Sequence, residues 1–161
     1  MTGRSAHGRR RSPRSFVATR DVLRIVDANS NRTREALRVV EDILRFSLED
    51  GRLAAALKAE RHRVARFCDQ VTGRGLKGLE ARDTAGDPGR DSMSPSEGSR
   101  RNLYEILLSN FRRAEESLRV LEEVTKLVDV GLARSLKRTR FRVYDLEKAC
   151  MIRMERRLAK D

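Results

Sequence analysis

The residues of this 161-residue chain that could do chemistry occur twice, in stretches that lie 81 positions apart. NSNRTREALRVVED begins at Asn29, and NFRRAEESLRVLEE begins at Asn110. The shared polar positions pair Asn29 with Asn110, Arg32 with Arg113, Glu35 with Glu116, Arg38 with Arg119, and Glu41 with Glu122. Arginine suits phosphate because its planar guanidinium group donates two parallel hydrogen bonds, and glutamate suits Mg²⁺ or a polar heterocycle. The repeated set is therefore compatible with sites for phosphorylated ligands.

The asparagine of each copy falls on the side of the helix that should be buried. At about 100° per residue, Asn29 lies in the middle of an apolar stripe that contains Ala36, Val40 and Ile43, and Asn110 has the same position in its own stretch. A buried Asn needs hydrogen-bond partners, since leaving it unpaired costs roughly 1–3 kcal/mol. One interpretation is structural: the two Asn pair with each other or with flanking Arg, and Arg and Glu form a solvated ion-pair lattice. The other is that these residues line a polar cavity between helices.

A further group of acidic residues lies between the two stretches. Asp83, Asp87 and Asp91 recur every four residues in a segment rich in Gly and Pro. Such residues either contact a Mg²⁺-nucleotide or simply form turns, because Asp side chains accept hydrogen bonds from nearby backbone N–H groups. The whole segment 73–98 is long for a loop of a compact domain, which is typical of a functional lid or of a disordered connection.

Four helices are needed to position these residues. Apolar periodicity predicts helices at about 19–46, at 52–72, from Ser96 or Ser99 to 128, and from a break at 129–131 to 158. Thr19 is the expected N-cap of the first helix, and Gly73 should stop the second. The repetition extends to LKAERHRVARF at Leu57 and LKRTRFRVYDL at Leu136, so each half should be a helical hairpin. We therefore predict an all-α fold, a four-helix bundle built from two repeated helical hairpins with pseudo-twofold symmetry.

The predicted organisation is a single helical domain at residues 21–161, preceded by a disordered basic tail at residues 1–20. Within the domain, repeat one covers 21–72, the loop covers 73–98, and repeat two covers 99–158. The tail contains six Arg and no Asp or Glu, a composition that cannot bury a core.

Net charge and hydropathy exclude several classes of function. The net charge of +12 suggests nucleic acid, but 30 basic and 24 acidic residues remain once the tail is removed. Basic residues interleaved with acidic ones, and only 4% aromatic residues, disfavour nucleic-acid binding. No apolar run reaches bilayer length and none is of signal-peptide type, so we expect no membrane contact and a cytoplasmic location.

The stretch RIVDANSNRTREALRVVEDILRF, which begins at Arg24, resembles the opening signature of a small all-helical family in thiamine biosynthesis, the hydroxymethylpyrimidine phosphate kinases. Members of this family occur alone and as an N-terminal domain fused to thiamine-phosphate synthase. Further similarity lies in the pair Arg61-His62, in the loop ARDTAGDPG, in SNFRRAEESLRVLEEVTKL and in RFRVYDLEK. The resemblance covers about residues 21–152.

The resemblance implies ATP-dependent phosphorylation of 4-amino-5-hydroxymethyl-2-methylpyrimidine phosphate to its diphosphate, with ATP as co-substrate and Mg²⁺ as cofactor. Such chemistry depends on positioning and charge neutralisation, which Arg side chains and Mg²⁺ provide. Residue chemistry, and not the resemblance, supplies the individual roles. Arg82, Asp83 and Asp87 are the expected catalytic residues, on a lid near the nucleotide. The expected substrate-binding residues are Asn29, Arg32, Asn110, Arg113, Glu41 and Glu122, and no metal ligand can be assigned.

Two other functions stay open. A non-catalytic module could bind the pyrimidine or act as a scaffold for thiamine-phosphate synthase, since the chain contains no recognised nucleotide-binding motif. An RNA-binding helical protein is supported by charge alone. The expected partners are the phosphorylated pyrimidine and ATP, with thiamine-phosphate synthase and a second copy of the chain, in a homodimer, as further candidates. Because no barrel domain follows Asp161, the synthase would be a separate polypeptide unless the chain is a fragment.

Overall fold

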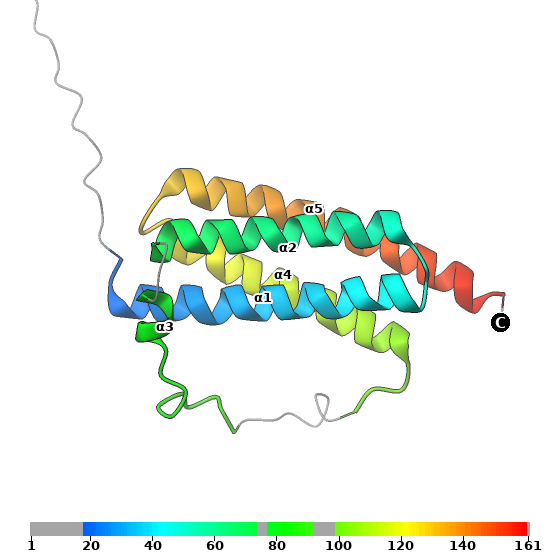
Figure 1. Ribbon diagram of the computed structural model, residues 1–161, viewed down its shortest axis with the longest axis horizontal. Coiled ribbons are helices and arrows are strands. Elements are labelled where there is room, and N and C mark those ends of the chain that lie inside the picture. The colour runs from blue at the N-terminus through cyan, green and yellow to red at the C-terminus, as the bar shows by residue number, and fades with distance from the viewer. Residues whose placement is uncertain (1–17, 74–76, 92–98, 161) are drawn as a thin grey trace, which may run out of the picture.

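The computed structural model describes residues 18–73, 77–91 and 99–160, and all regular structure in these ranges is helical. The helices are α1 (Arg20–Phe46), α2 (Gly51–Thr72), α3 (Lys77–Ala81), α4 (Leu103–Thr125) and α5 (Val130–Leu158) (Figure 1). The predicted all-α class is therefore confirmed for the described residues. Most of the predicted basic tail, residues 1–17, lies outside them.

Capping residues set the ends of the long helices. Thr19, Asp50, Asn102 and Asp129 each accept a hydrogen bond on a side-chain oxygen from a backbone N–H group in the first turn of α1, α2, α4 and α5. Gly73 ends α2 with a φ of 76°, a left-handed value that glycine adopts without a steric penalty. The predicted cap at Thr19 and the predicted stop at Gly73 are thus confirmed.

The predictions for the third helix and for the loop before it are partly wrong. α4 begins at Leu103, because the side chain of Asn102 caps it, and Ser99 lies ahead of the helix. The other predicted start, Ser96, lies outside the described residues. α4 also ends early, at Thr125, where the backbone turns towards α5. The segment predicted as a loop, 73–98, contains the short helix α3, which packs against α1.

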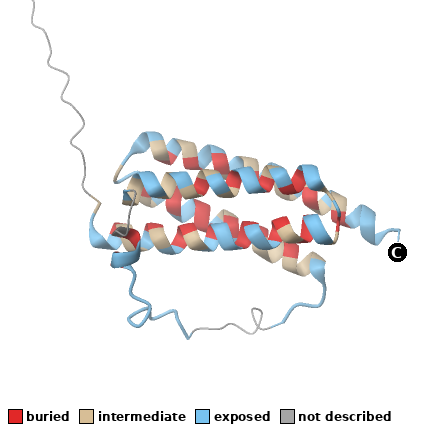
Figure 2. Ribbon diagram, in the orientation of Figure 1, coloured by how far each residue is buried: buried red, intermediate tan, exposed pale blue. Residues whose placement is uncertain are grey.

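The four long helices lie side by side, and α1 and α4 run in opposite directions (Figure 1). α1 packs against α2 and α4, and α5 packs against the same two helices. Apolar residues that recur every three or four positions face inward, so Leu37, Val40, Leu44, Phe111 and Leu118 are fully buried. Figure 2 shows the buried residues on the inner sides of the helices. Removal of this aliphatic surface from water, worth about 25 cal/mol per Å², drives the packing.

Equivalent buried ion pairs join the two helices of each half. Arg61 of α2 donates from Nε and Nη2 to Glu41 Oε2 of α1, at 3.2 and 3.1 Å. Arg140 of α5 donates from the same two nitrogens to Glu122 Oε2 of α4, at 3.0 and 2.9 Å. Both glutamates are 3% exposed. The repetition in the sequence therefore extends to tertiary contacts.

Candidate functional site

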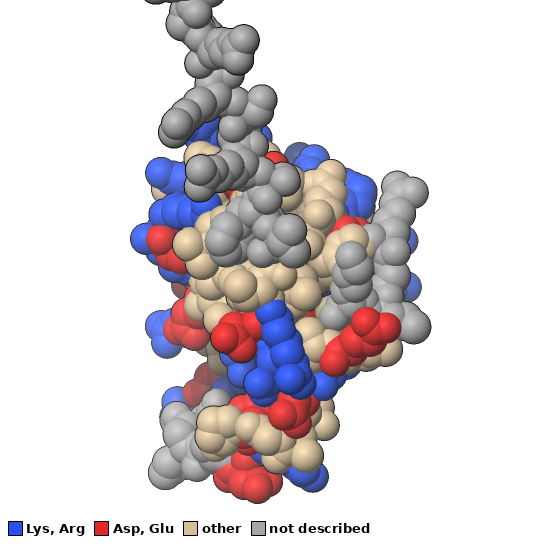
Figure 3. Space-filling model, turned by 90° about the vertical axis from the view of Figure 1, so that its left-hand side faces the viewer, with Lys and Arg blue, Asp and Glu red and all other residues tan. Residues whose placement is uncertain are grey.

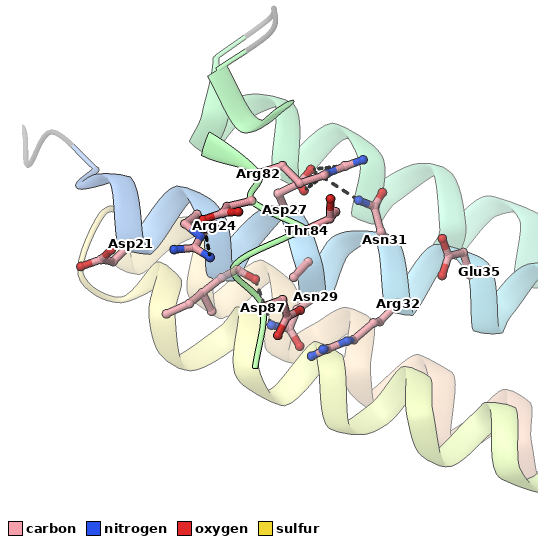
Figure 4. A pocket seen from close by; sticks show the side chains of 13 residues that line it. Asp21, Arg24, Asp27, Asn29, Asn31, Arg32, Glu35, Arg82, Thr84 and Asp87 are labelled. Carbon is pink, nitrogen blue, oxygen red and sulfur yellow. Dashed lines mark hydrogen bonds and ion pairs between the residues drawn. The ribbon is translucent and has the colours of Figure 1, made fainter. Parts of the chain in front are cut away.

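A pocket on α1 brings together five of the nine predicted site residues: Asn29, Arg32, Arg82, Asp83 and Asp87. It has a volume of about 660 Å³, which is within the range of small-molecule sites, and it lies between the first half of α1 and the segment after α3 (Figure 4). We call it the α1 pocket. Its lining residues are Asp21, Arg24, Ile25, Asp27, Ala28, Asn29, Asn31, Arg32, Glu35, Arg82, Asp83, Thr84 and Asp87.

Arg82 is held at the α1 pocket by a two-point ion pair with Asp27 of α1. Its Nε and Nη2 donate to Oδ2 and Oδ1 of Asp27, at 2.7 and 2.8 Å (Figure 4). The hydrogen bond to Asp27 raises the pKa of Arg82, so the guanidinium group stays charged. The two residues are 55 positions apart, and no local pattern in the sequence indicates their pairing. Sequence reasoning therefore missed Asp27, which ties the segment after α3 to α1.

Asp83 and Asp87 form turns and also line the α1 pocket. Asp83 Oδ1 accepts a hydrogen bond from the backbone N–H of Gly86 at 2.8 Å, and Asp87 Oδ1 accepts one from Gly89 at 2.9 Å. The turn-forming interpretation is therefore confirmed, and the turns hold both carboxylates at the pocket. Asp91, the third member of the series, has a side chain that is 98% exposed and is not among the lining residues.

Asn29 and Arg32 lie near the middle of α1. Asn29 is 6% exposed, as its position on the helical wheel predicts, and its Nδ2 donates to the backbone oxygen of Ile25 at 2.9 Å. The prediction that the two repeated Asn pair with each other or with flanking Arg is wrong, because each amide bonds to its own helix. Arg32 is exposed, and it forms no hydrogen bond or ion pair with the residues that the structure describes. Figure 4 shows its side chain directed to the side of α1 on which α4 lies.

A second pocket, the α4 pocket, occupies the equivalent place in the second repeat and has a volume of about 610 Å³. Its lining residues are Ser99, Arg100, Arg101, Glu105, Leu108, Ser109, Arg112, Arg113 and Glu116. Six of these, from Glu105 to Glu116, follow six α1-pocket positions at a constant spacing of 81. Arg113 thus lines a pocket of its own, apart from that of Arg32. Asn110 is half-buried, donates to the backbone oxygen of Ile106 at 2.8 Å, and does not line the α4 pocket.

The two pockets have opposite balances of charge. Five carboxylates and three guanidinium groups line the α1 pocket, whereas four guanidinium groups and two carboxylates line the α4 pocket. An acidic pocket favours a phosphate that arrives with a divalent cation, and a basic pocket favours the bare anion. The duplicated helix therefore carries two pockets that suit different ligands.

Glu41 and Glu122, both predicted to bind substrate, are occupied by arginine. Each glutamate has a second ion pair within its own helix, besides the interhelical pair with Arg61 or Arg140. Arg38 Nη1 lies 3.7 Å from Glu41 Oε1, and Arg119 Nη1 lies 3.0 Å from Glu122 Oε1. Glu122 also lines a cavity of about 320 Å³ at the junction of α4 and α5. Buried carboxylates that are paired in this way hold helices together, because the loss of one partner leaves an uncompensated charge. Their binding of a ligand stays a prediction.

Within the described residues, no group of three or more His, Cys, Asp or Glu side chains is arranged to hold a metal ion. Mg²⁺ is commonly bound by only one or two carboxylates together with substrate phosphates. Asp83 and Asp87 at the rim of the α1 pocket fit such a partial donor set. The remaining ligands would have to come with the bound phosphates.

The surface at the end of the molecule that carries α3 has mixed charge. Figure 3 shows Lys and Arg side chains interspersed with Asp and Glu on this face, with no broad basic area. Such a surface does not resemble the continuous basic stripe of a nucleic-acid-binding domain. Among the described residues, no helix is long and apolar enough to cross a membrane.

Comparison with known proteins places the chain in a family. The model of the ThiD2 family matches residues 24–149. The thiamine-phosphate synthases of Nostoc sp. and Gloeobacter violaceus are 44% and 45% identical to it over 130 and 133 residues, which are 81% and 83% of this chain. The chain spans only 35% and 37% of the length of these two relatives. No solved structure is significantly similar. Because the match covers most of the chain, including α2, α4 and every pocket-lining residue of the α1 and α4 pockets except Asp21, the protein belongs to the ThiD2 family.

Proposed function

We propose that the protein catalyses the ATP-dependent phosphorylation of 4-amino-5-hydroxymethyl-2-methylpyrimidine phosphate to its diphosphate, as a step of thiamine biosynthesis. Membership of the ThiD2 family and relatives named thiamine-phosphate synthase support the pathway. The structural observation that carries the proposal is the α1 pocket. It gathers Asn29 and Arg32 from the first repeat with Arg82, Asp83 and Asp87 from the segment after α3.

The pocket has the groups that phosphoryl transfer requires. An oxygen of the acceptor phosphate forms a bond to the γ-phosphorus of ATP, and the bond from that phosphorus to the bridging oxygen of ADP breaks. Arg32, which has no partner among the described residues, and Arg82, which Asp27 holds in place, would neutralise the anions that meet. Asp83 and Asp87 would hold Mg²⁺, which supplies further neutralisation when it is bound with the nucleotide.

The repeated contacts also support the finer description of the fold. We infer that the four long helices form a bundle of two helical hairpins related by a pseudo-twofold axis. Two features of the described residues support this: the ion pairs Arg61–Glu41 and Arg140–Glu122, and the two pockets spaced by 81 positions. A cytoplasmic location, which a pathway of phosphorylated intermediates favours, completes the proposal.

The second candidate function is a non-catalytic module that binds the pyrimidine or supports thiamine-phosphate synthase. One observation favours it: the curated relatives carry that enzyme's name, and this chain matches only about a third of their length. The module would bind the pyrimidine phosphate without forming the diphosphate. The two candidates therefore differ in turnover and not in binding.

The test is an assay of the purified chain with ATP, Mg²⁺ and the pyrimidine phosphate, followed by separation of the diphosphate product. Asp87→Asn should lower kcat about 100-fold, since it removes a charge that positions the nucleotide. Asp91→Asn is the matched control, because it changes the same residue type in the same segment but outside the pocket, and it should stay within about twofold of the wild type.

A second variant moves a carboxylate without changing its charge. A Cβ at Gly86 would lie 2.6 Å from Asp83 Oδ2, so Gly86→Ala should displace that carboxylate and lower kcat. No product above the rate without protein would reject the kinase. Binding of the pyrimidine phosphate in the absence of product would then favour the non-catalytic module.

A further inference from the structure

The α4 pocket shares two lining residues with a neighbouring cavity, so two adjacent hollows follow α4. The cavity has a volume of about 390 Å³ and is lined by Arg112, Glu115, Glu116, Arg119 and Tyr144. Two of these, Arg112 and Glu116, also line the α4 pocket. The shared residues make the two hollows adjacent, and we call the combined feature the α4 groove. Its chemistry differs from one end to the other.

One end of the α4 groove is basic. Arg112 and Arg113 are exposed there and form no hydrogen bond or ion pair with the described residues. Arg100 and Arg101 also line this end: Arg100 donates from Nε to Ser109 Oγ at 3.2 Å, and Arg101 donates from Nε to Glu105 Oε1 at 2.7 Å. Several guanidinium groups that line one pocket can donate hydrogen bonds to the oxygens of a phosphate group.

The other end of the groove has an aromatic wall that is held in place. Arg140 donates from Nη1 to Tyr144 Oη at 2.8 Å, and its guanidinium carbon lies 5.5 Å from the centre of the Tyr144 ring. Phe141 meets Tyr144 edge to face at 5.8 Å. Arg140 is itself fixed by Glu122, so the buried ion pair positions the ring. The position equivalent to Tyr144 in the first repeat is Ala65, so only the second repeat has this wall.

Glu115 adds a hydrogen-bonding group beside the aromatic wall. Its Oε1 is buried and has no hydrogen-bond partner among the described residues. Burial, together with the neighbouring charge of Glu147 on α5, raises the pKa of Glu115 to about 8. A protonated carboxyl group can donate a hydrogen bond to a ring nitrogen of the kind that aminopyrimidines and adenine present. The first repeat has Arg34 at this position and offers no such pairing.

We propose that the α4 groove binds the phosphate ester of an amino-substituted heterocycle, with the phosphate at Arg112 and Arg113 and the ring between Tyr144 and Glu115. Two molecules of the proposed reaction have this chemistry, the pyrimidine phosphate and ATP. Naming these two molecules as the ligands rests on the proposed function. The chemistry of the groove does not depend on it. The groove therefore adds a second ligand-binding surface, on the second repeat, to the α1 pocket.

Isothermal titration calorimetry of the full chain tests this with three probes: the pyrimidine phosphate, a non-hydrolysable ATP analogue, and ribose 5-phosphate, which has no base. Arg113→Gln should lower the affinity for whichever ligand binds the groove at least tenfold. Tyr144→Leu should lower the affinity for the same ligand about fivefold. The affinity for ribose 5-phosphate should not change, since only the contact with the ring is lost. Tyr144→Phe keeps the ring but loses the hydrogen bond from Arg140, so its affinity should lie between that of the wild type and that of Tyr144→Leu. The control is Arg66→Gln, an exposed arginine of α2 that lines neither pocket.

The heterocyclic probe that responds to both Arg113→Gln and Tyr144→Leu identifies which phosphate ester occupies the groove. Wild-type binding of all three probes by both variants, with unchanged thermal unfolding, would overturn the inference. The same would follow if Arg32→Gln removed the binding of both heterocyclic probes while Arg113→Gln removed neither. Turnover separates this result from the proposed function. If the groove binds its ligand but no diphosphate is formed, the groove proposal is supported and the kinase proposal is rejected. If Tyr144→Leu and Arg113→Gln both turn over at the wild-type rate, the kinase proposal is supported and the groove is rejected as a binding site for its substrates.

Discussion

The α1 pocket and the α4 pocket occupy equivalent places on a duplicated helix, but they differ in what surrounds them. The positions that the repeats share include the glutamates at 41 and 122, which are buried between helices, and their half-buried arginine partners. The two pockets keep the shared pairs Arg32/Arg113 and Glu35/Glu116 but differ at other lining positions: Asp27 corresponds to Leu108, and Ala28 to Ser109. Internal packing tolerates little change, whereas a pocket rim tolerates much. The shared buried glutamates therefore hold the helices together, and the divergent lining positions give the two pockets different chemistry.

The segments that complete the two pockets also differ. α3 and the turns formed by Asp83 and Asp87 bring carboxylates to the α1 pocket, and the Arg82–Asp27 pair fixes them. Ser99 to Arg101, just before α4, bring two arginines to the α4 pocket. The segment after α3 thus adds two carboxylates and one guanidinium group to a pocket whose α1 residues already supply three carboxylates and two guanidinium groups. The following three predictions test this contrast between shared and divergent positions.

The largest effect is expected where the repeats agree. Glu41→Gln and Glu122→Gln each remove one partner of a buried ion pair and should lower the free energy of unfolding by about 3 kcal/mol, with nearly equal effects in the two halves. Urea denaturation measures this. The exposed equivalents Glu35→Gln and Glu116→Gln should change stability by less than about 0.5 kcal/mol. A small loss for either buried glutamate would contradict a shared structural role.

A smaller effect is expected where the repeats differ. Asp27→Asn breaks the two-point pair with Arg82, which should release the segment after α3 at a cost of about 1 kcal/mol and increase tryptic cleavage after Arg90 roughly fivefold. The control is Asp21→Asn, another α1-pocket carboxylate that forms no ion pair with the described residues. Equal cleavage of the two variants would show that the pair does not anchor the segment.

The smallest effect concerns the dependence of stability on pH. Glu115 has a folded-state pKa of about 8, above its ordinary value, so the folded chain binds a proton that the unfolded chain releases. This contribution to stability is fully present below the unfolded pKa and is lost as the pH rises through about 8. Thermal unfolding between pH 6 and 9 should therefore show declining stability in the wild type and a flatter profile in Glu147→Gln. Glu155→Gln, an exposed change on the same helix, should leave the slope unchanged.

Local signals account for what could be predicted. Thr19 and Gly73 mark helix ends through their own side chain or backbone freedom, so they were identified from the sequence alone. Ser99 and Asn102 are both good caps by residue type, and the structure uses Asn102, whose side chain accepts from the N–H of Glu105, so α4 begins later than the sequence predicts. The helical wheel correctly predicts that Asn29 is buried, but the sequence does not predict its hydrogen-bond partner. An Asn in a helix can donate to the carbonyl four residues before it instead of bonding to another helix.

The sequence by itself determined the helices, the apolar stripes and the duplicated polar set, because each follows from periods of three or four residues and from the spacing of 81. Only the tertiary structure decided which of those polar residues share a pocket. Arg82 meets Asp27 across 55 positions, Arg140 meets Glu122 across 18, and Arg32 and Arg113 line separate pockets. The physical reason is that side-chain pairing across helices depends on how the helices pack, and the sequence of one helix does not specify which partner lies opposite.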